Sequence, residues 1–435
     1  YALYNTADGT FTHNNGMVAI TTNTNTFIYG MEGDDTSGSG ANAFNRLQVE
    51  LTDAAYYCKL RPAAGTAHVI KGNVTVAEGL FQTETDGHTL TIEGDVSVES
   101  GGTLGHADHD GNDSFGSLTI ASGGTCIASE GVTTIVGQPS GDYMLNNSGT
   151  FTHNEGTLTI SRSSNSGSKY MKAGSGDLKH LIIDETYSGG GISVVPIVGV
   201  LNVAGNLTVT DGQLRVYGGS GAIDVDGDVL ISSGGILTTE STQLAANGVE
   251  AEFGSLTIAS GGEYSATPLT TTITGETGGG YAIFNTAGGT LTHNSGTVNI
   301  ATTGNNNTLI FGMEGDDTSG TGANAFNHLT VTLTTGYRVE LDPAAGTAHV
   351  IKGNLTIVEG LLYPDDHAHT LTIEGNVYIE SGGQLGHASR SGADTFNGLV
   401  TNSGTLLTTS GTNNFNGGVR NLGTFTSNDT LTIGG

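Results

Sequence analysis

The chain has 435 residues, of which 42 are acidic and 13 are basic, so its formal net charge is −29. That balance excludes nucleic acid and anionic membrane surfaces as partners, because both need clustered lysine and arginine. Apolar residues make up only 35% of the chain and 71 residues are glycine, which favours a thin core over a large globule. The longest apolar run, 192–205, contains Pro196 and is too short to span a bilayer.

In chain order, the sequence starts a long unit that recurs. GTFTHN at Gly9 returns at Gly149 and, as GTLTHN, at Gly289, while PAAGTAHVIKGN at Pro62 returns at Pro343. Self-similarity at a fixed period is the signature of repeat architectures. We therefore divide the chain into a first copy (1–140), a diverged middle copy (141–280), a third copy (281–422) and the start of a fourth (423–435), all in one continuous rod.

Each copy contains a finer motif, a short strand of alternating apolar and polar residues followed by a glycine turn. In the first copy its first apolar positions are Val18, Leu47, Val74, Val96 and Leu118, then one near 132–136, then Leu158. The middle copy gives Leu207, Val229 and Leu256, and the third gives Leu355, Val377 and Leu399. The commonest step is 22 residues, as from 74 to 96 and from 96 to 118.

A single strand of this kind cannot bury its apolar side chains, but a neighbouring coil stacked on it can cover them. The sequence therefore predicts an all-β fold, a parallel β-solenoid of about 22-residue coils, most simply a right-handed β-helix. A row of antiparallel sandwich domains is the alternative, and the fixed step disfavours it.

The ten residues FGSLTIASGG occur twice, from Phe115 and from Phe253. We interpret them as one strand and its turn: the phenylalanine packs inside, Leu118 and Ile120 fill the interior, and the glycines form tight corners.

The patterns F-x-x-L-T-I, G-N-L-T-V and G-T-F-T-H-N around Gly-Gly turns resemble the repetitive β-strand proteins of bacterial surfaces and phage fibres. Filamentous-haemagglutinin-like adhesins and autotransporter passengers are similar. The resemblance covers nearly the whole chain, but its motifs encode the coil and not an activity. It implies a right-handed, extracellular, non-enzymatic stalk or adhesin, and it carries over no functional residue.

Two kinds of acidic loop are weak calcium candidates, because clustered carboxylates with glycine suit that ion. One loop recurs in the first and third copies and is absent from the middle copy; the other, DHDGND, lacks the bidentate glutamate of an EF-hand. The candidate ligands are Glu32, Asp34, Asp35, Asp108, Asp110, Asp113, Glu314, Asp316 and Asp317. No other cofactor is predicted.

Several recurring polar residues have simpler explanations. The histidines at 13, 153 and 293, at 68 and 349, and at 106 and 387 are expected to bond local backbone at corners. Asn73, Asn206 and Asn354 are expected to bond neighbouring coils. Cys58 aligns with Val339 and Cys126 with Leu406, so both thiols are expected in the core without a disulfide.

No constellation of nucleophile and base stands out, so we predict that the chain is not an enzyme. Lys59 becomes Glu340 and Arg61 becomes Asp342 in the third copy, and Arg390 faces no partner in the first. Ice binding is disfavoured because Tyr378 breaks the outward threonine column.

We expect a stiff extracellular or cell-surface scaffold, a filament subunit or the stalk of an adhesin. Its partners would be further copies, bound through solenoid ends or through the loops 31–45 and 313–327, and a glycan receptor. The alternative is a phage tail fibre or tailspike on a virion surface that binds, and in one version cleaves, surface glycans.

Overall fold

The structure is a computed structural model that describes residues 1–6, 9–33, 42–62, 67–84, 87–136, 142–162, 169–185, 194–217, 222–239, 249–303, 307–315, 324–334, 336–342, 348–364, 368–387 and 389–435. Over these residues the chain is all-β without a helix, and its parallel strands stack as a β-solenoid about 23 residues apart. The predicted fold class is therefore confirmed. No helix in the described residues is long and apolar enough to cross a membrane.

The chain divides into two compact units. Unit 1 comprises Tyr1–Gly205 with Asp211–Leu214, and unit 2 comprises Asn206–Thr210 with Arg215–Gly435. The boundary falls inside the middle copy, so the compact units do not coincide with the three sequence copies.

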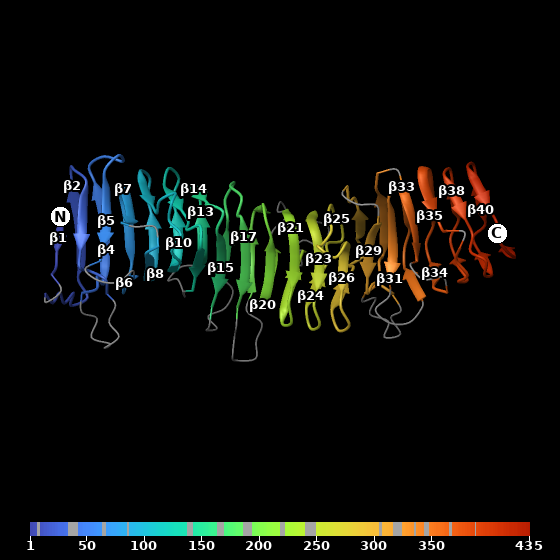
Figure 1. Ribbon diagram of the computed structural model, residues 1–435, viewed down its shortest axis with the longest axis horizontal. Coiled ribbons are helices and arrows are strands. Elements are labelled where there is room, and N and C mark those ends of the chain that lie inside the picture. The colour runs from blue at the N-terminus through green and yellow to red at the C-terminus, as the bar shows by residue number, and fades with distance from the viewer. Residues whose placement is uncertain are drawn as a thin grey trace. The chain divides into compact units, whose positions relative to one another are not determined.

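Unit 1 contains three ladders of parallel strands, and successive strands of each ladder lie side by side (Figure 1). Ladder A joins β2 (Met17–Thr22), β4 (Arg46–Leu51), β7 (Val74–Thr83), β8 (Thr89–Val98), β10 (Asp113–Ile120), β13 (Tyr143–Asn147), β16 (Tyr170–Lys172) and β18 (Val194–Val198). Ladder B joins β6 (Ala67–Ile70), the first halves of β8 and β10, β12 (Val132–Ile135), β15 (Thr157–Ser161) and β17 (His180–Asp184). Ladder C joins β1 (Leu3–Tyr4), β3 (Thr26–Tyr29), β5 (Tyr57–Arg61), the end of β7, β9 (Gly102–Leu104), β11 (Thr125–Ile127) and β14 (Thr150–Thr152). A short strand, β19 (Leu201–Val203), also belongs to this unit.

Unit 2 repeats this arrangement. Ladder D joins β20 (Leu207–Tyr217), β21 (Ile223–Ile231), β23 (Ala251–Ile258), β26 (Tyr281–Asn285), β29 (Asn307–Phe311), β31 (Arg338–Asp342), β33 (Leu355–Pro364), β35 (Val377–Leu385), β38 (Thr405–Leu407) and β41 (Thr424–Thr426). Ladder E joins the first halves of β21 and β23, β25 (Thr270–Ile273), β28 (Thr297–Ile300), β30 (His328–Thr332), the first halves of β33 and β35, β37 (Val400–Asn402) and β40 (Val419–Asn421). Two further ladders contain β22 (Gly235–Thr238), β24 (Glu263–Ser265) and β27 (Thr290–Thr292), and β32 (Ala348–Ile351), β34 (Thr370–Ile373), β36 (Thr395–Phe396), β39 (Asn413–Phe415) and β42 (Leu431–Ile433).

The predicted order of coils is confirmed up to Leu118 and wrong beyond it. Val18, Leu47, Val74, Val96 and Leu118 are register partners in ladder A. The next partner is Leu145, whereas the strands that begin at Val132 and contain Leu158 lie in ladder B. In the third copy, Val377 pairs with Val400, and Leu399 is exposed on the preceding turn.

This error has a physical cause. Both the strand at 132–135 and the strand at 143–147 carry alternating apolar residues, so the pattern cannot tell which continues the ladder. The coils also differ in length, since Val18 to Leu47 spans 29 residues and Val74 to Val96 spans 22. One sequence copy is therefore not a whole number of coils, and β2 and its counterpart β15 lie in different ladders.

The repeated decapeptide behaves as predicted in both places. Phe115, Leu118 and Ile120 are buried, and so are their counterparts at 253, 256 and 258. A Cβ on Gly116 would lie 2.5 Å from the carbonyl oxygen of Gly94, because the strand passes from ladder B to ladder A there. Gly123 has a φ of +85°, which glycine adopts without strain. The sequence recurs because two coils share one set of packing constraints.

Asparagine side chains join successive coils at one corner. The Oδ1 atom of Asn73 accepts a hydrogen bond from the backbone N–H of Asp95 at 3.0 Å. Asn206 and Asn354 accept equivalent bonds from Asp228 and Asn376, each 22 residues further on. The prediction that these asparagines bond the neighbouring coil is confirmed for the coil that follows.

Candidate functional site

The structure does not bring the predicted calcium ligands together where it describes them. Asp34, Asp35, Asp316 and Asp317 lie outside the described residues, so the sites at Glu32 and Glu314 stay a prediction. Asp108 and Asp110 are exposed, whereas Asp113 is 7% exposed and hydrogen-bonded inside the solenoid. Within the described ranges, no group of three His, Cys, Asp or Glu side chains could hold a metal ion. The DHDGND loop thus presents at most two of its predicted carboxylate ligands outward.

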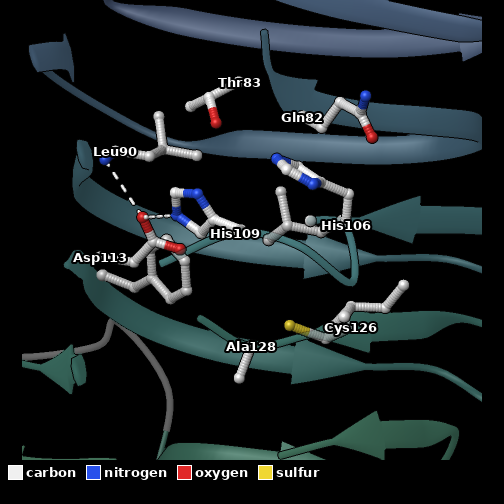
Figure 2. A pocket seen from close by; sticks show the side chains of 12 residues that line it. Gln82, Thr83, Leu90, His106, His109, Asp113, Cys126 and Ala128 are labelled. Atoms are coloured by element: carbon white, nitrogen blue, oxygen red, sulfur yellow. Dashed lines mark hydrogen bonds and ion pairs between the residues drawn. The ribbon is translucent and has the colours of Figure 1, made fainter. Parts of the chain in front are cut away.

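Asp113 instead belongs to a buried polar cluster in unit 1. Its Oδ1 atom lies 2.9 Å from Nε2 of His109 and accepts a bond from the backbone N–H of Leu90 at 3.1 Å. Figure 2 shows this pair inside the coil, with His106 on one side and Cys126 on the following coil. Burial raises the pKa of Asp113, and the hydrogen bond from His109 opposes that rise.

The cluster continues to the preceding coils through two more histidines. The rings of His68 and His88 are 5.5 Å apart, and both residues are buried. Burial lowers the pKa of His68 to about 4, and the neighbouring His88 lowers it further. Burial also lowers the pKa of His88. His68 is therefore neutral at physiological pH and packs as a core side chain.

This cluster is sealed against substrates. The cavity that it surrounds has a volume of about 10 Å³, which is about the space that one water molecule needs. Burial, with the charge of Asp113 beside it, raises the pKa of the Cys126 thiol, so the thiol stays protonated. A buried protonated thiol is a poor nucleophile, so the arrangement of His109, Asp113 and Cys126 is a core cluster rather than a catalytic triad.

Unit 2 contains the same cluster with three coupled replacements. Arg390, 2% exposed, stands where unit 1 has His109, so the inference that Arg390 has no counterpart in the first copy is wrong. Tyr363 stands in place of Gln82, and Glu340 in place of Lys59. The guanidinium carbon of Arg390 lies 5.3 Å from the centre of the Tyr363 ring, and the Tyr363 hydroxyl donates to Glu340 at 2.8 Å. Glu340 thus supplies a negative charge near a buried arginine.

The histidine predictions are confirmed only in part. Nδ1 of His13 accepts a bond from the N–H of Asn15 at 2.9 Å, and His153 and His293 form the same turn. The two residues after each of these histidines have positive φ, as in a type I′ turn. His68 and His349 are instead buried core residues, so a corner role for them is wrong. Cys58 and Cys126 are buried and free of disulfides, as predicted.

The clearest acidic surface feature is a groove in unit 2. Its volume is about 280 Å³, and it is lined by Asp224, Glu250, Glu252, Thr270 and Thr272 among others. Asp224, Glu252 and Thr272 occupy the same register position on three successive coils. Partial burial and the charges of Asp224 and Asp226 raise the pKa of Glu252. Two neighbouring carboxylates with unequal proton affinities are thus exposed in one groove.

Aromatic rings form outward rows in both units. Tyr4 and Tyr29 stack with centroids 4.7 Å apart in unit 1, and Phe284 and Phe311 stack at 5.0 Å in unit 2. Arg61 lies over the ring of Phe27, with 4.4 Å from its guanidinium carbon to the ring centre. These stacks hold neighbouring coils together, and Tyr4 remains 58% exposed.

Comparison with known proteins gives no relative. No protein-family model, no curated protein and no solved structure matches the chain.

Proposed function

We propose that the chain is a structural β-solenoid, a stiff extracellular or cell-surface scaffold that serves as a filament subunit or an adhesin stalk, and that it is not an enzyme. The observation that carries the proposal is the uniform stacking in both units. Each described ladder adds one parallel strand per coil, and apolar side chains fill the interior from coil to coil. Such a structure suits the transmission of force along the stack.

Two further observations support a surface role. The net charge of −29 keeps the chain soluble and self-repelling in a dilute medium. The outward aromatic rows offer flat apolar faces to which a sugar ring or another chain can bind. Self-association would use the solenoid ends or the loops at 31–45 and 313–327.

Sedimentation velocity over a range of protein concentrations tests the proposal. We expect a sedimentation coefficient that rises with concentration. A variant that lacks residues 34–41 and 316–323 should associate less if the loops make lateral contacts, and equally if the ends do. A single species at every concentration would contradict self-association.

The acidic groove favours a second candidate, a tailspike-like protein that cleaves glycans. Glycoside hydrolysis needs one protonated and one ionised carboxyl group flanking the scissile bond, and Glu252 and Asp224 are the candidates for those roles. The test is the release of reducing ends from a panel of surface polysaccharides, with Glu252→Gln as the variant and Glu263→Gln as the control. Release that is lost only in Glu252→Gln would establish this candidate.

A further inference from the structure

The largest groove in the described part of unit 1 lies at a corner of the middle copy. Its volume is about 580 Å³, and its lining includes Asn147, Ser148, Lys172, Val200 and Asn202. Ligand pockets typically fall between about 300 and 1,000 Å³. The groove therefore has room for one or two sugar rings.

The groove exists because the middle copy lacks a loop that fills this corner in the other two copies. In the first copy, Asn5 Nδ2 donates to the carbonyl of Gly30 and to Oδ1 of Asn42, which closes the loop that Met31 begins. In the third copy, Asn285 makes the same bonds, and Met31 and Met313 are both only 2% exposed.

In the middle copy, Asn147 makes the first of these bonds alone, to the carbonyl of Ala173 at 2.7 Å. Gly174 follows where the other copies place the buried methionine. The corner is therefore open, and the backbone of Gly149, Gly174 and Gly199 forms part of its lining. Backbone without side chains allows close approach of a ligand.

A lysine without a carboxylate partner lies in this groove. Lys172 Nζ donates to the hydroxyl of Ser148 at 2.9 Å, and no described carboxylate lies within ion-pair distance of it. Lys71, Lys179 and Lys352, by contrast, each form an ion pair with a glutamate. The equivalent positions in the first and third copies are Tyr29 and Phe311, so the charge is specific to the open corner.

We propose that this groove binds a carboxylated pyranose, a uronic acid residue of a surface polysaccharide. Lys172 would pair with the sugar carboxylate, and one ammonium group matches its single charge better than the double charge of a phosphate monoester. Ser148, Ser175 and Asn202 present hydroxyl and amide groups to the ring hydroxyls, and the partly exposed Val198 and Val200 face its C–H surface. In a chain of net charge −29, a localised cation directs an anionic ligand to one place.

The site deepens the proposed surface function by naming a glycan class, but its test is separate from self-association. Binding of digalacturonic acid and of digalactose is measured by saturation-transfer NMR and calorimetry on the full chain at low salt. We expect the acidic disaccharide to bind and the neutral one to bind at least tenfold more weakly. Added salt should weaken binding, because an exposed ion pair is screened.

Two variants locate the site. Lys172→Gln should weaken binding at least tenfold, and Ser175→Trp, at an exposed lining position, should block the groove. Lys71→Gln, a surface lysine of the same unit, is the matched control and should bind as the original chain does. Equal binding of the neutral sugar, no binding of the acid, or equal losses in Lys71→Gln and Lys172→Gln would overturn the proposal. Sedimentation of Lys172→Gln should match that of the original chain, so failure of the site leaves the scaffold function standing, and the reverse also holds.

Discussion

At the scale of single residues, the solenoid buries charges that need their partners. Arg162 and Glu185 lie one coil apart with side chains 1% and 0% exposed, and Arg162 Nε donates to Glu185 at 2.6 Å. Removing one member leaves the other charge buried and unpaired, whereas replacing both with apolar residues avoids that cost.

We therefore predict that Arg162→Met lowers the free energy of unfolding by about 3–5 kcal/mol. The double variant Arg162→Met/Glu185→Leu should recover most of that loss. Chemical denaturation of the two variants measures the difference. Equal destabilisation by both would show that packing, rather than the unpaired charge, dominates at this position.

Asp394 gives a pH dependence with a definite sign. Its Oδ1 atom accepts a bond from the N–H of Leu371 at 3.0 Å, and burial raises its pKa from 3.8 to about 7. Between those values the folded state holds more protons than the unfolded state, so this group's stabilising contribution is lost as the pH rises through about 7.

Asp394→Asn keeps the oxygen that accepts the Leu371 bond and removes the titration. We predict that, relative to the original chain, the variant gains unfolding free energy between pH 4 and pH 8, by a few kcal/mol at about 1.4 kcal/mol per pKa unit. Denaturation at several pH values measures the gain. The exposed Glu380→Gln is the control, and a parallel pH profile for Asp394→Asn and the original chain would contradict the assignment.

At the scale of one element, Gly116 shows how a strand serves two ladders. The strand β10 bends at this residue, and an added Cβ would lie 2.5 Å from the Gly94 carbonyl oxygen. Gly116→Ala must therefore displace one coil from the next. We predict a loss of about 2 kcal/mol or more in unfolding free energy, measured by chemical denaturation. Gly278→Ala, where no atom lies within 4 Å of the added Cβ, should change it by less than about 1 kcal/mol; equal effects would refute the packing argument.

Elements are also where the sequence was most and least informative. The alternation in β4, β7 and β8 sufficed to predict their stacking, because an inward residue must be apolar on every coil. It did not suffice at β12 and β13, where two adjacent strands carry the same pattern and only the fold decides which one continues ladder A.

The buried polar cluster was missed although a signal was present. His68, His88 and His109 follow at steps of 20 and 21 residues, close to one coil, and His349, His369 and Arg390 repeat those steps. Comparing histidines one coil apart, instead of one copy apart, would have predicted the cluster. The groove at Lys172 was foreshadowed by the missing loop, but its openness depends on side-chain volumes that spacing does not reveal.

At the scale of the whole molecule, the charge of −29 opposes association of like chains. Salt screens that repulsion, since the Debye length falls from about 30 Å at 0.01 M to about 8 Å at 0.15 M. We predict that self-association strengthens as sodium chloride rises over this range, as measured by sedimentation. Weakening instead would mean that ion pairs between chains, rather than strand edges or loops, hold the assembly together.

The central claim is that this solenoid is a scaffold that assembles with further copies. Electron microscopy of the purified chain at neutral pH, with and without a calcium chelator, tests it most directly. The account predicts long fibres with an axial repeat, and their dissolution by the chelator would assign calcium to the loops that carry Glu32 and Glu314. Isolated particles or discrete trimers under both conditions would contradict the filament and favour a stalk or a phage fibre.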